Sequence, residues 1–486
     1  MFADHPKGLK VLFYTELWER MSYYGMRGLL VLFMTASISD GGLNYSNISA
    51  SAIYGIYASS VYLMALPGGW IGDRVLGQQK AILYGGIIIT LGHFILAINF
   101  TSTFFFGLTL VVLGTGLLKP NISALVGSLY HKKENLKQSG FTLFYMAINV
   151  GSVLGFFICG YLGEKIGWHY GFSAAGFGMA LGILRYKYNL PILGNIGLKP
   201  NLQITHSEKR RDIKLVLISL VLICSILLLG TLGIIKFNPV PLASILTLII
   251  SFIAILYFFY IFMLGGLNTQ EKKNITMIIV LFISSAFFWA GFDQAGSSFS
   301  IFAKEYTDRY IFNWEYPSTW LQILNPVLVV VLSPFLAALW ISLGKKMLDP
   351  SLPFKFGVGL ILMAIGFVFV AMGANIAISS GSAGVKWLLL TYLFHTLGEL
   401  VISPIGLAAI SDLSPKKFAG QMMGVWFLAS SLGAIIAGLL SGQATNEGLV
   451  SMPILFNKIA FGASIFGMVL IIISRPLNRL LLEKNK

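Results

Sequence analysis

Charged side chains inside an apolar segment near the start of the chain are the first residues that could do chemistry. On a helix that turns by about 100° per residue, five side chains fall on one face: Glu16, Glu19, Arg20, Tyr23 and Arg27. Each charge costs roughly 2.5–3.5 kcal/mol to place in a membrane helix unless it faces water or a partner. We therefore expect this face to line a polar cavity; the alternative is an ion network that only holds helices together.

A second group of ionisable residues lies in later apolar segments. Lys119 follows the uncharged run 81–118, and Asp293 and Glu399 occur in the second half of the chain. Arg27 could hold a carboxylate through its planar fork and Lys119 as a point charge, whereas Glu399 could accept an ammonium group. These groups would suit a small solute that carries both charges. The alternative is a static pairing in which the two acids only neutralise the two cations.

Amides and prolines accompany these charges. The side chains of Asn149 and Asn325 can hydrogen-bond either end of such a solute or its backbone. They can equally well bridge neighbouring helices, so both interpretations stay open. Pro120 and Pro404 each remove a backbone donor beside the charged positions, which gives the lining helices local freedom.

Other classes of chemistry find no support in the residues. His93 and His395 lack a second His or Cys at ligand spacing, so we predict no metal site. Cys159 and Cys224 lie in apolar runs and form no CxxC motif. The sequence contains no Walker loop, and its apolar segments contain no nucleophile–base pair. We therefore expect neither an enzyme nor an ATP-driven pump, and no loop is long enough for a receptor's sensor domain.

The elements that must position these residues are membrane helices. Of the 486 residues, 56% are apolar and 11% are charged, which is less than half the charged share of a soluble domain. A spanning helix needs about 20 apolar residues. The uncharged runs predict fourteen spans, at 11–36, 50–71, 80–98, 103–128, 139–162, 169–190, 213–235, 240–265, 275–300, 321–343, 356–377, 387–411, 418–441 and 455–474.

Basic residues are distributed unevenly between the connecting segments. Most of the 34 lysines and arginines fall in alternate segments, which are cytoplasmic if the amino terminus is inside. The net charge of +15 is therefore a signal of topology and does not indicate a nucleic-acid-binding surface. It predicts a multi-pass membrane protein with both termini in the cytoplasm.

The predicted spans divide into three parts. Residues 1–190 are interpreted as an N-terminal six-helix bundle and 275–486 as a C-terminal one, while 191–274 hold a cytoplasmic linker and two inserted helices. Segments 120–129 and 404–413, in the fourth helix of each half, resemble each other as parallel repeats do. We therefore predict an all-α fold of two related six-helix bundles with the inserted pair outside them.

Several motifs resemble those of known transporters. Residues 72–77, Gly-Asp-Arg-Val-Leu-Gly, are similar to the cytoplasmic-loop motif of the major facilitator superfamily, whose Asp and Arg help to latch the two halves. Within that superfamily, Glu-x-x-Glu-Arg and Tyr-Tyr-Gly at 16–25 resemble the first-helix signature of the proton-coupled oligopeptide transporters (POT/PTR family). Later signatures of the same family are similar to the segments at 144–151, 288–294, 324–326 and 398–404.

The resemblance covers nearly the whole chain, in order, from residue 16 to residue 427. The inserted helical pair also looks like the insertion typical of prokaryotic members. Two positions depart from the pattern: Met21 stands where the family usually has Phe, and Ala147 where many members have Ser. Both departures concern local packing, so they leave the expected activity unchanged.

The resemblance implies roles for individual residues. Those expected to couple transport to protons are Glu16, Glu19, Arg20 and Asp293. Those expected to bind peptide are Tyr23, Tyr24, Arg27, Tyr62, Lys119, Tyr145, Asn149, Trp289, Asn325, Glu399, Trp426 and Phe427. Gating is expected to use Asp73 and Arg74 together with the salt bridges Arg27–Asp293 and Lys119–Glu399.

We therefore expect a proton-coupled symporter of the bacterial inner membrane that imports di- and tripeptides by alternating access. Its partners would be the peptide substrate and the lipid bilayer, without nucleic acid. Protons would be the coupling ion, no other cofactor would be needed, and a monomer would suffice for function. The alternative is a major facilitator transporter of another small charged solute, such as an anion or a drug.

Overall fold

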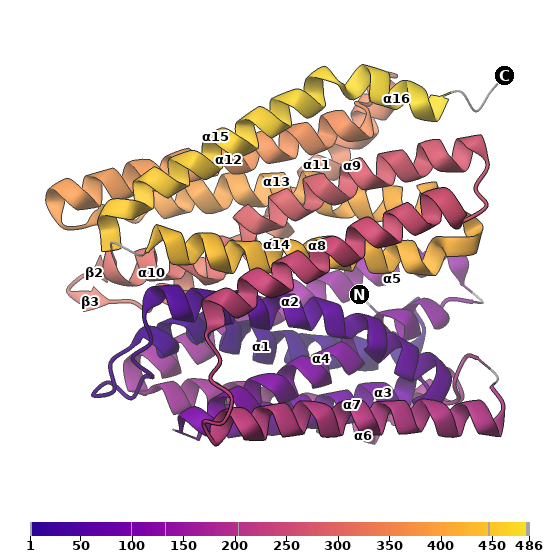
Figure 1. Ribbon diagram of the computed structural model, residues 1–486, viewed down its shortest axis with the longest axis horizontal. Helices are drawn as coiled ribbons and strands as arrows, with labels where there is room; N and C mark the ends of the chain where they lie inside the picture. Colours follow the sequence, from indigo (N-terminus) through magenta and orange to yellow (C-terminus); the bar gives the residue numbers. More distant parts are fainter. Residues whose placement is uncertain (1, 99, 132, 203, 446–447, 483–486) are drawn as a thin grey trace. The chain divides into compact units, whose positions relative to one another are not determined.

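The computed structural model describes residues 2–98, 100–131, 133–202, 204–445 and 448–482, and these residues are mainly helical (Figure 1). Contacts between residues divide the chain into two compact units. Unit 1 comprises Met1–Asn44 and Ser60–Asn238, and unit 2 comprises Tyr45–Ser59 and Pro239–Lys486. The second helix therefore contributes residues to both units.

Unit 1 is built from long helices. They are α1 (Lys7–Thr35), the end of α2 (Asn47–Ile71), α3 (Gln78–Leu96), α4 (Thr101–Ser128), α5 (Lys137–Tyr161), α6 (Trp168–Leu193) and α7 (His206–Thr231). A π-helical turn, Gly72–Leu76, follows α2, and a second one, Leu162–Ile166, follows α5. A short 3₁₀ turn, Glu134–Leu136, precedes α5.

Unit 2 contains the start of α2 and the rest of the chain. Its helices are α8 (Pro239–Leu264), α9 (Thr269–Phe292), α10 (Ser298–Glu305), α11 (Leu324–Lys345), α12 (Leu352–Ser380), α13 (Lys386–Leu413), α14 (Ala419–Ala444), α15 (Ser451–Ile472) and α16 (Ser474–Leu482). Its 3₁₀ turns are Asp293–Gly296, Ser318–Ile323, Lys416–Phe418 and Gly448–Val450.

The predicted set of membrane helices is confirmed. In the described part of the chain, fourteen helices have 19 or more residues, and they correspond in order to the fourteen expected spans. Twelve of the fourteen are long and apolar enough to cross a membrane, by length and composition alone. The other two are α1, which carries the charged stripe, and α6, which contains Arg185 and Lys187.

The ninth helix departs from the expected span at 275–300. The α-helix ends at Phe292, a 3₁₀ turn follows, and α10 begins at Ser298. Gly296 in this turn packs against the hydroxyl of Tyr54, where a Cβ atom would overlap the tyrosine oxygen. The break therefore comes from a tertiary contact within unit 2 and from the extended φ of −131° at Ser297.

Short strands interrupt the otherwise helical chain. β1 (Thr307–Asp308) pairs in parallel with β4 (Ala383–Gly384), and β2 (Tyr310–Ile311) pairs antiparallel with β3 (Trp314–Glu315). Arg309, at the start of the β2–β3 hairpin, forms an ion pair with Glu315 and donates a hydrogen bond of 2.6 Å to the carbonyl of Tyr316. The strands tie together loops that connect membrane helices, and the all-α prediction is correct for the helical framework.

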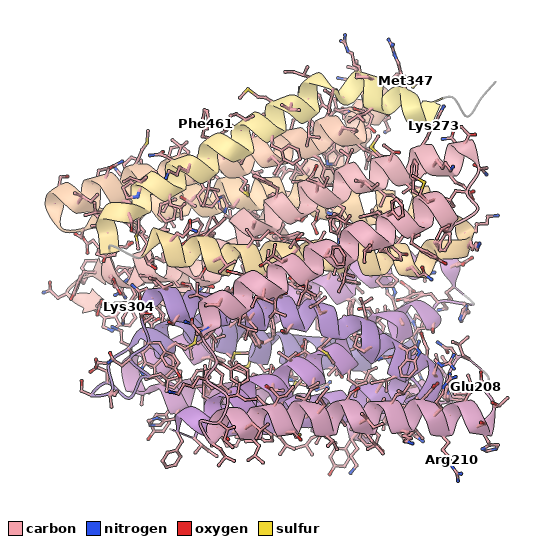
Figure 2. The ribbon with its side chains drawn as sticks, in the orientation of Figure 1. Glu208, Arg210, Lys273, Lys304, Met347 and Phe461 are labelled. Atoms are coloured by element: carbon pink, nitrogen blue, oxygen red, sulfur yellow. The ribbon has the colours of Figure 1, made fainter. Side chains whose placement is uncertain are left out.

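The linker before α7 is shorter than the sequence predicted, because α7 begins at His206 and not near residue 213. A capping box starts the helix: Thr205 accepts a hydrogen bond from the Glu208 amide, and the Glu208 carboxylate accepts one of 2.8 Å from the Thr205 amide. Glu208 and Arg210 project from this first part of α7 (Figure 2). The capping box explains why α7 begins at His206, before the apolar stretch that starts near residue 213.

The two inserted helices each pack with their own unit. Along α7, all of whose residues are described, the only buried one is Asp212. In unit 2, Tyr257 of α8 donates a hydrogen bond of 2.9 Å to the amide oxygen of Gln421 of α14. Most other side chains of both helices are exposed, as expected for helices that face lipid.

Candidate functional site

Small residues bring α5 against α1 and so set the position of the charged stripe. A Cβ atom on Gly151 would lie 2.9 Å from Cβ of Arg20 and even closer to the Leu17 carbonyl. A Cβ atom on Gly155 would lie 2.8 Å from the backbone nitrogen of Gly25. Glycine permits this close approach of two helix backbones, which is a common way to pack helices in membranes.

The acidic end of the stripe is an ion network buried in unit 1. Arg20 forms an ion pair with Glu19, and its Nε lies 3.4 Å from Oε1 of Glu16. All three side chains are at most 2% exposed. The guanidinium carbon of Arg20 also lies 4.8 Å from the ring centre of Tyr23, within the range of a cation–π contact. Two carboxylates therefore share one arginine, which leaves this cluster with a net negative charge when both are ionised.

The basic end of the stripe meets Lys119 of α4. The guanidinium carbon of Arg27 lies 6.0 Å from the ring centre of Tyr24, and Nζ of Lys119 lies 5.7 Å from that of Tyr62. The charge of Lys119 interacts with those of Arg27, Arg20 and both glutamates. Arg27 and Lys119 are half-buried, in contrast to the fully buried Arg20. Unit 1 therefore places two accessible cations beside aromatic rings, as a carboxylate-binding surface requires.

Residues of α5 complete the part of the site in unit 1. Asn149 is 6% exposed, and its Nδ2 donates a hydrogen bond of 3.0 Å to the carbonyl of Tyr145 in the same helix. This bond uses an amide hydrogen and leaves the amide oxygen able to accept. Tyr145 is 44% exposed. Of the two predicted residues, the tyrosine is therefore the more accessible.

In unit 2, a hydrogen-bond network orients Glu399 of α13. Nδ2 of Asn325, in the first turn of α11, donates a bond of 2.8 Å to Oε2 of Glu399 and one of 3.1 Å to Oγ1 of Thr396. Asn325 and Glu399 are half-buried, and Thr396 is fully buried. Both amide hydrogens of Asn325 are engaged, so its amide oxygen is the group that remains able to bind a donor. The carboxylate and this oxygen together offer a surface that accepts hydrogen bonds.

Asp293 and Trp289 lie at the break after α9. Asp293 is 2% exposed and follows the last residue of that helix. The Trp289 ring meets the rings of Phe288 and Phe292 edge to face, at centre-to-centre distances of 5.6 and 5.3 Å. The tryptophan is half-buried, so it can contact a bound solute while its neighbours fix its orientation.

The two aromatic residues predicted on α14 differ in exposure. Trp426 is 5% exposed and packs against Gly406 of α13, where a Cβ atom would overlap its ring. Phe427 is half-buried. The structure thus makes Phe427 the more accessible of the two, while the assignment of Trp426 to a peptide pocket stays a prediction.

The motif after α2 is anchored within unit 1. Asp73 accepts a hydrogen bond of 2.8 Å from the Asn201 side chain, and Nε of Arg74 lies 2.8 Å from Oδ2 of Asp212. Asp212 is fully buried and also lies 3.3 Å from Nη2 of Arg211. The Asp73 and Arg74 side chains therefore hold the linker and the start of α7, and a latching role for them stays a prediction.

Sequence reasoning missed three residues that support these groups. Thr396 lies one helical turn before Glu399, and this spacing on one face was the available signal. Asn201 and Asp212 lie in or next to the linker, far from the motif in sequence, and no spacing pattern connects them to Asp73 and Arg74. The expected bridges Arg27–Asp293 and Lys119–Glu399 join residues of different units and stay predictions.

The two buried histidines are packing residues in this structure. His395 lies among the rings of Phe292, Phe299 and Phe367, with the Phe367 ring centre 5.0 Å from its own. His93 is also fully buried. Among the described residues, no group of three or more His, Cys, Asp or Glu side chains could bind a metal ion.

Comparison with known proteins identifies the family. A model described as "POT family" matches residues 79–454. The chain is 40% identical to "Peptide transporter YePEPT" of Yersinia enterocolitica, over 99% of this chain and 96% of that protein. It is 35% identical to a "Di-/tripeptide transporter" of Lactococcus lactis subsp. cremoris, over 99% of this chain and 97% of that one.

A solved structure of a mutant peptide transporter POT in complex with alafosfalin has the same fold as this chain. The TM-score is 0.91 at 34% sequence identity, and the match covers 99% of this chain and 97% of that one. The resemblance read from the motifs is thereby confirmed over the full length. The chain belongs to the POT family and is a multi-pass membrane transporter, not an enzyme.

Proposed function

We propose that this protein is a proton-coupled symporter that imports di- and tripeptides by alternating access. The observation that carries the proposal is the Asn325–Glu399 hydrogen bond, which presents a carboxylate and an amide oxygen together. An ammonium group needs several acceptors at once because it has three donors. Relatives named as peptide and di-/tripeptide transporters support the same substrate class.

The two ends of the peptide would bind to different charged groups. Its carboxylate would bind Arg27 and Lys119 of unit 1, where aromatic rings flank both cations. Its ammonium group would bind Glu399 of unit 2, and the amides of Asn149 and Asn325 would orient its backbone. The remaining predicted contacts would line the side-chain pockets: Tyr23, Tyr24, Tyr62, Tyr145, Trp289, Trp426 and Phe427.

Coupling would follow from competition for the cations. In the proposed mechanism, Arg27 and Lys119 pair with Asp293 and Glu399 in at least one state, and the peptide carboxylate displaces these acids. Protonation then neutralises the released carboxylates, and both events weaken the attraction between the halves. A ligand shifts an equilibrium between outward and inward states only by binding them with different affinities.

Glu16, Glu19 and Arg20 would be the second site of proton coupling. Two carboxylates share one arginine there, so one proton changes the net charge of the cluster from negative to neutral. We place the protein in the bacterial inner membrane with both termini in the cytoplasm, because most basic residues lie on the side of the termini. We also propose that a monomer transports.

Uptake by reconstituted vesicles tests the proposal. A labelled dipeptide should accumulate above its external concentration only with an inward proton gradient, and a protonophore should abolish this accumulation. Unlabelled peptides with free termini should compete, whereas peptides blocked at the amino or carboxyl end should compete poorly. If an inorganic anion or a drug accumulated with the gradient and the dipeptide did not, the alternative substrate class would replace this one.

A further inference from the structure

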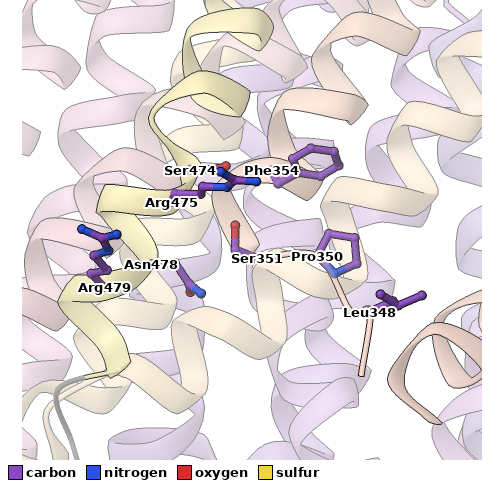
Figure 3. A pocket seen from close by; sticks show the side chains of 8 residues that line it. All are labelled: Leu348, Pro350, Ser351, Phe354, Ser474, Arg475, Asn478 and Arg479. Carbon is purple, nitrogen blue, oxygen red and sulfur yellow. The ribbon is translucent and has the colours of Figure 1, made fainter. Parts of the chain in front are cut away.

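A pocket of about 470 Å³ lies in unit 2 beside the start of α12 and the C-terminal helix α16, far in sequence from the peptide-binding residues (Figure 3). Arg475 and Arg479 lie one helical turn apart on α16, and Asn478 and Ser351 add an amide and a hydroxyl. The apolar part of the lining includes Phe354. The volume falls in the range of about 300–1,000 Å³ that is typical of pockets for small ligands.

The pocket is electrostatically positive. Neither arginine forms an ion pair with any of the residues that the structure describes, and no carboxylate lines the pocket. Asp349, which lies between the lining residues Leu348 and Pro350, is paired with Lys355, with Oδ1 and Nζ 2.8 Å apart. The first turn of α12 adds the amides of Leu352 and Phe354, since Pro353 has no N–H, and Ser351 before it makes no capping hydrogen bond with its side chain. Guanidinium groups and the amides at the start of a helix both bind phosphate groups.

The surroundings point to a lipid and not to a soluble anion. The pocket lies where the candidate span in α12 begins and the one in α15 ends, and the ends of spans are where phospholipid headgroups are expected. Four exposed apolar side chains occupy one face of α15 and lead to the pocket: Phe461, Ile465, Met468 and Ile472. Phe461 projects outward from the helix (Figure 2). Such a face can carry acyl chains while the arginines hold the headgroup.

We propose that Arg475 and Arg479 form a binding site for the phosphate of an anionic phospholipid, with its acyl chains along α15. The site is independent of the proposed transport function, because none of its residues belongs to the predicted peptide site. The lipid would fix α16 to the membrane surface in the leaflet on the side of the C-terminus. Guanidinium groups suit this role because they bind phosphate oxygens through paired hydrogen bonds.

Native mass spectrometry of the purified full-length protein tests the site, with phosphatidylglycerol as the anionic probe and phosphatidylcholine as the neutral one. The double variant Arg475→Gln, Arg479→Gln should lose about tenfold in affinity for phosphatidylglycerol. Phosphatidylcholine binding should not change. The charge-matched control Lys209→Gln, Arg210→Gln, which alters two exposed residues of α7, should retain wild-type binding.

Two further measurements keep the test decisive. The variant Arg475→Lys, Arg479→Lys retains both charges but loses the paired hydrogen bonds, so its affinity should lie between those of the wild type and the glutamine variant. Inorganic phosphate, added at the same concentration as the lipid, should not displace it, because phosphate lacks the acyl chains. The proposal is overturned if the glutamine variant and its control bind phosphatidylglycerol equally well, or if inorganic phosphate displaces the lipid completely.

Discussion

Asn325 donates a hydrogen bond of 2.8 Å to Glu399, and the same amide nitrogen donates one of 3.1 Å to Thr396. The bond joins the first turn of α11 to the middle of α13 within unit 2. The amide hydrogens therefore point to the protein, and the amide oxygen is left able to accept. The structure shows that Asn325 bridges two helices, and its contact with a ligand stays a prediction.

Replacing Asn325 should weaken substrate binding. In Asn325→Ala, Glu399 loses a charge-assisted hydrogen bond worth about 1.5–3 kcal/mol, so the KM for dipeptide uptake should rise about tenfold or more. The measurement is the concentration dependence of labelled dipeptide uptake. Asn189→Ala is the matched control, because that amide is exposed and only bonds its own helix at Arg185. An unchanged KM in Asn325→Ala would remove the amide from the binding site.

Glu399→Gln tests the site for the amino group. The variant keeps a side chain of the same shape but loses the negative charge, so it should bind free-amino peptides more weakly, by about tenfold. Peptides with an acetylated amino end carry no ammonium group, so their affinity should change little between wild type and variant. Competition assays with both peptide classes measure the difference. Equal affinity of wild type and variant for free-amino peptides would show that the assignment to Glu399 is wrong.

Gly151 and Gly127 give a matched pair of glycine-to-alanine changes in two helices of unit 1. At Gly151 a Cβ atom meets the backbone of Leu17 and Cβ of Arg20, so alanine should overpack the α1–α5 contact and cost about 1–3 kcal/mol. At Gly127 the nearest atom is Cζ of Phe141 at 3.7 Å, an ordinary contact, so alanine should be neutral or stabilising. The midpoint of thermal unfolding in detergent compares them. Similar midpoints would contradict the close packing seen here.

Helix positions and charged faces could be read from the sequence because they depend on local composition. Uncharged runs located the long helices. The three- and four-residue spacing placed one set of side chains on one face of α1: Glu16, Glu19, Arg20, Tyr23 and Arg27. The break that begins at Asp293 could not be read in the same way, because it depends on the contact between Gly296 and the distant Tyr54.

Partners that are distant in sequence were equally hidden. Nothing in the spacing of Asp73 and Arg74 indicates that Asn201 and Asp212 will meet them, since that depends on how the linker folds. The unequal exposure of Trp426 and Phe427 likewise follows from the packing of α14 on α13. Local pattern therefore predicts which residues can act, and tertiary packing decides which of them are supported and accessible.

The Arg74–Asp212 ion pair should stabilise the junction between the π-helical turn and α7. Arg74→Gln leaves the Asp212 carboxylate with Arg211 as its remaining cation at 3.3 Å, which should lower the stability of this junction. The unfolding midpoint should therefore fall. Asp212→Asn should remove most of the additional effect of Arg74→Gln in a double-mutant cycle. Strictly additive effects would mean that the pair contributes nothing to stability.

The acids proposed for coupling can be separated from those that only support the fold. Glu19 belongs to the buried network with Arg20, and Asp293 is 2% exposed at the end of α9. Glu19→Gln and Asp293→Asn remove the titrating group but preserve the shape of the side chain. If the replaced acid couples transport to protons, its variant should lose proton-driven accumulation. The same variant should retain gradient-free counterflow, in which labelled peptide exchanges for unlabelled peptide. Glu134→Gln, an exposed residue of a 3₁₀ turn, is the control and should retain both activities. If both variants still accumulated peptide uphill with the proton gradient, neither acid would carry the coupling proton and the proposed mechanism would be wrong.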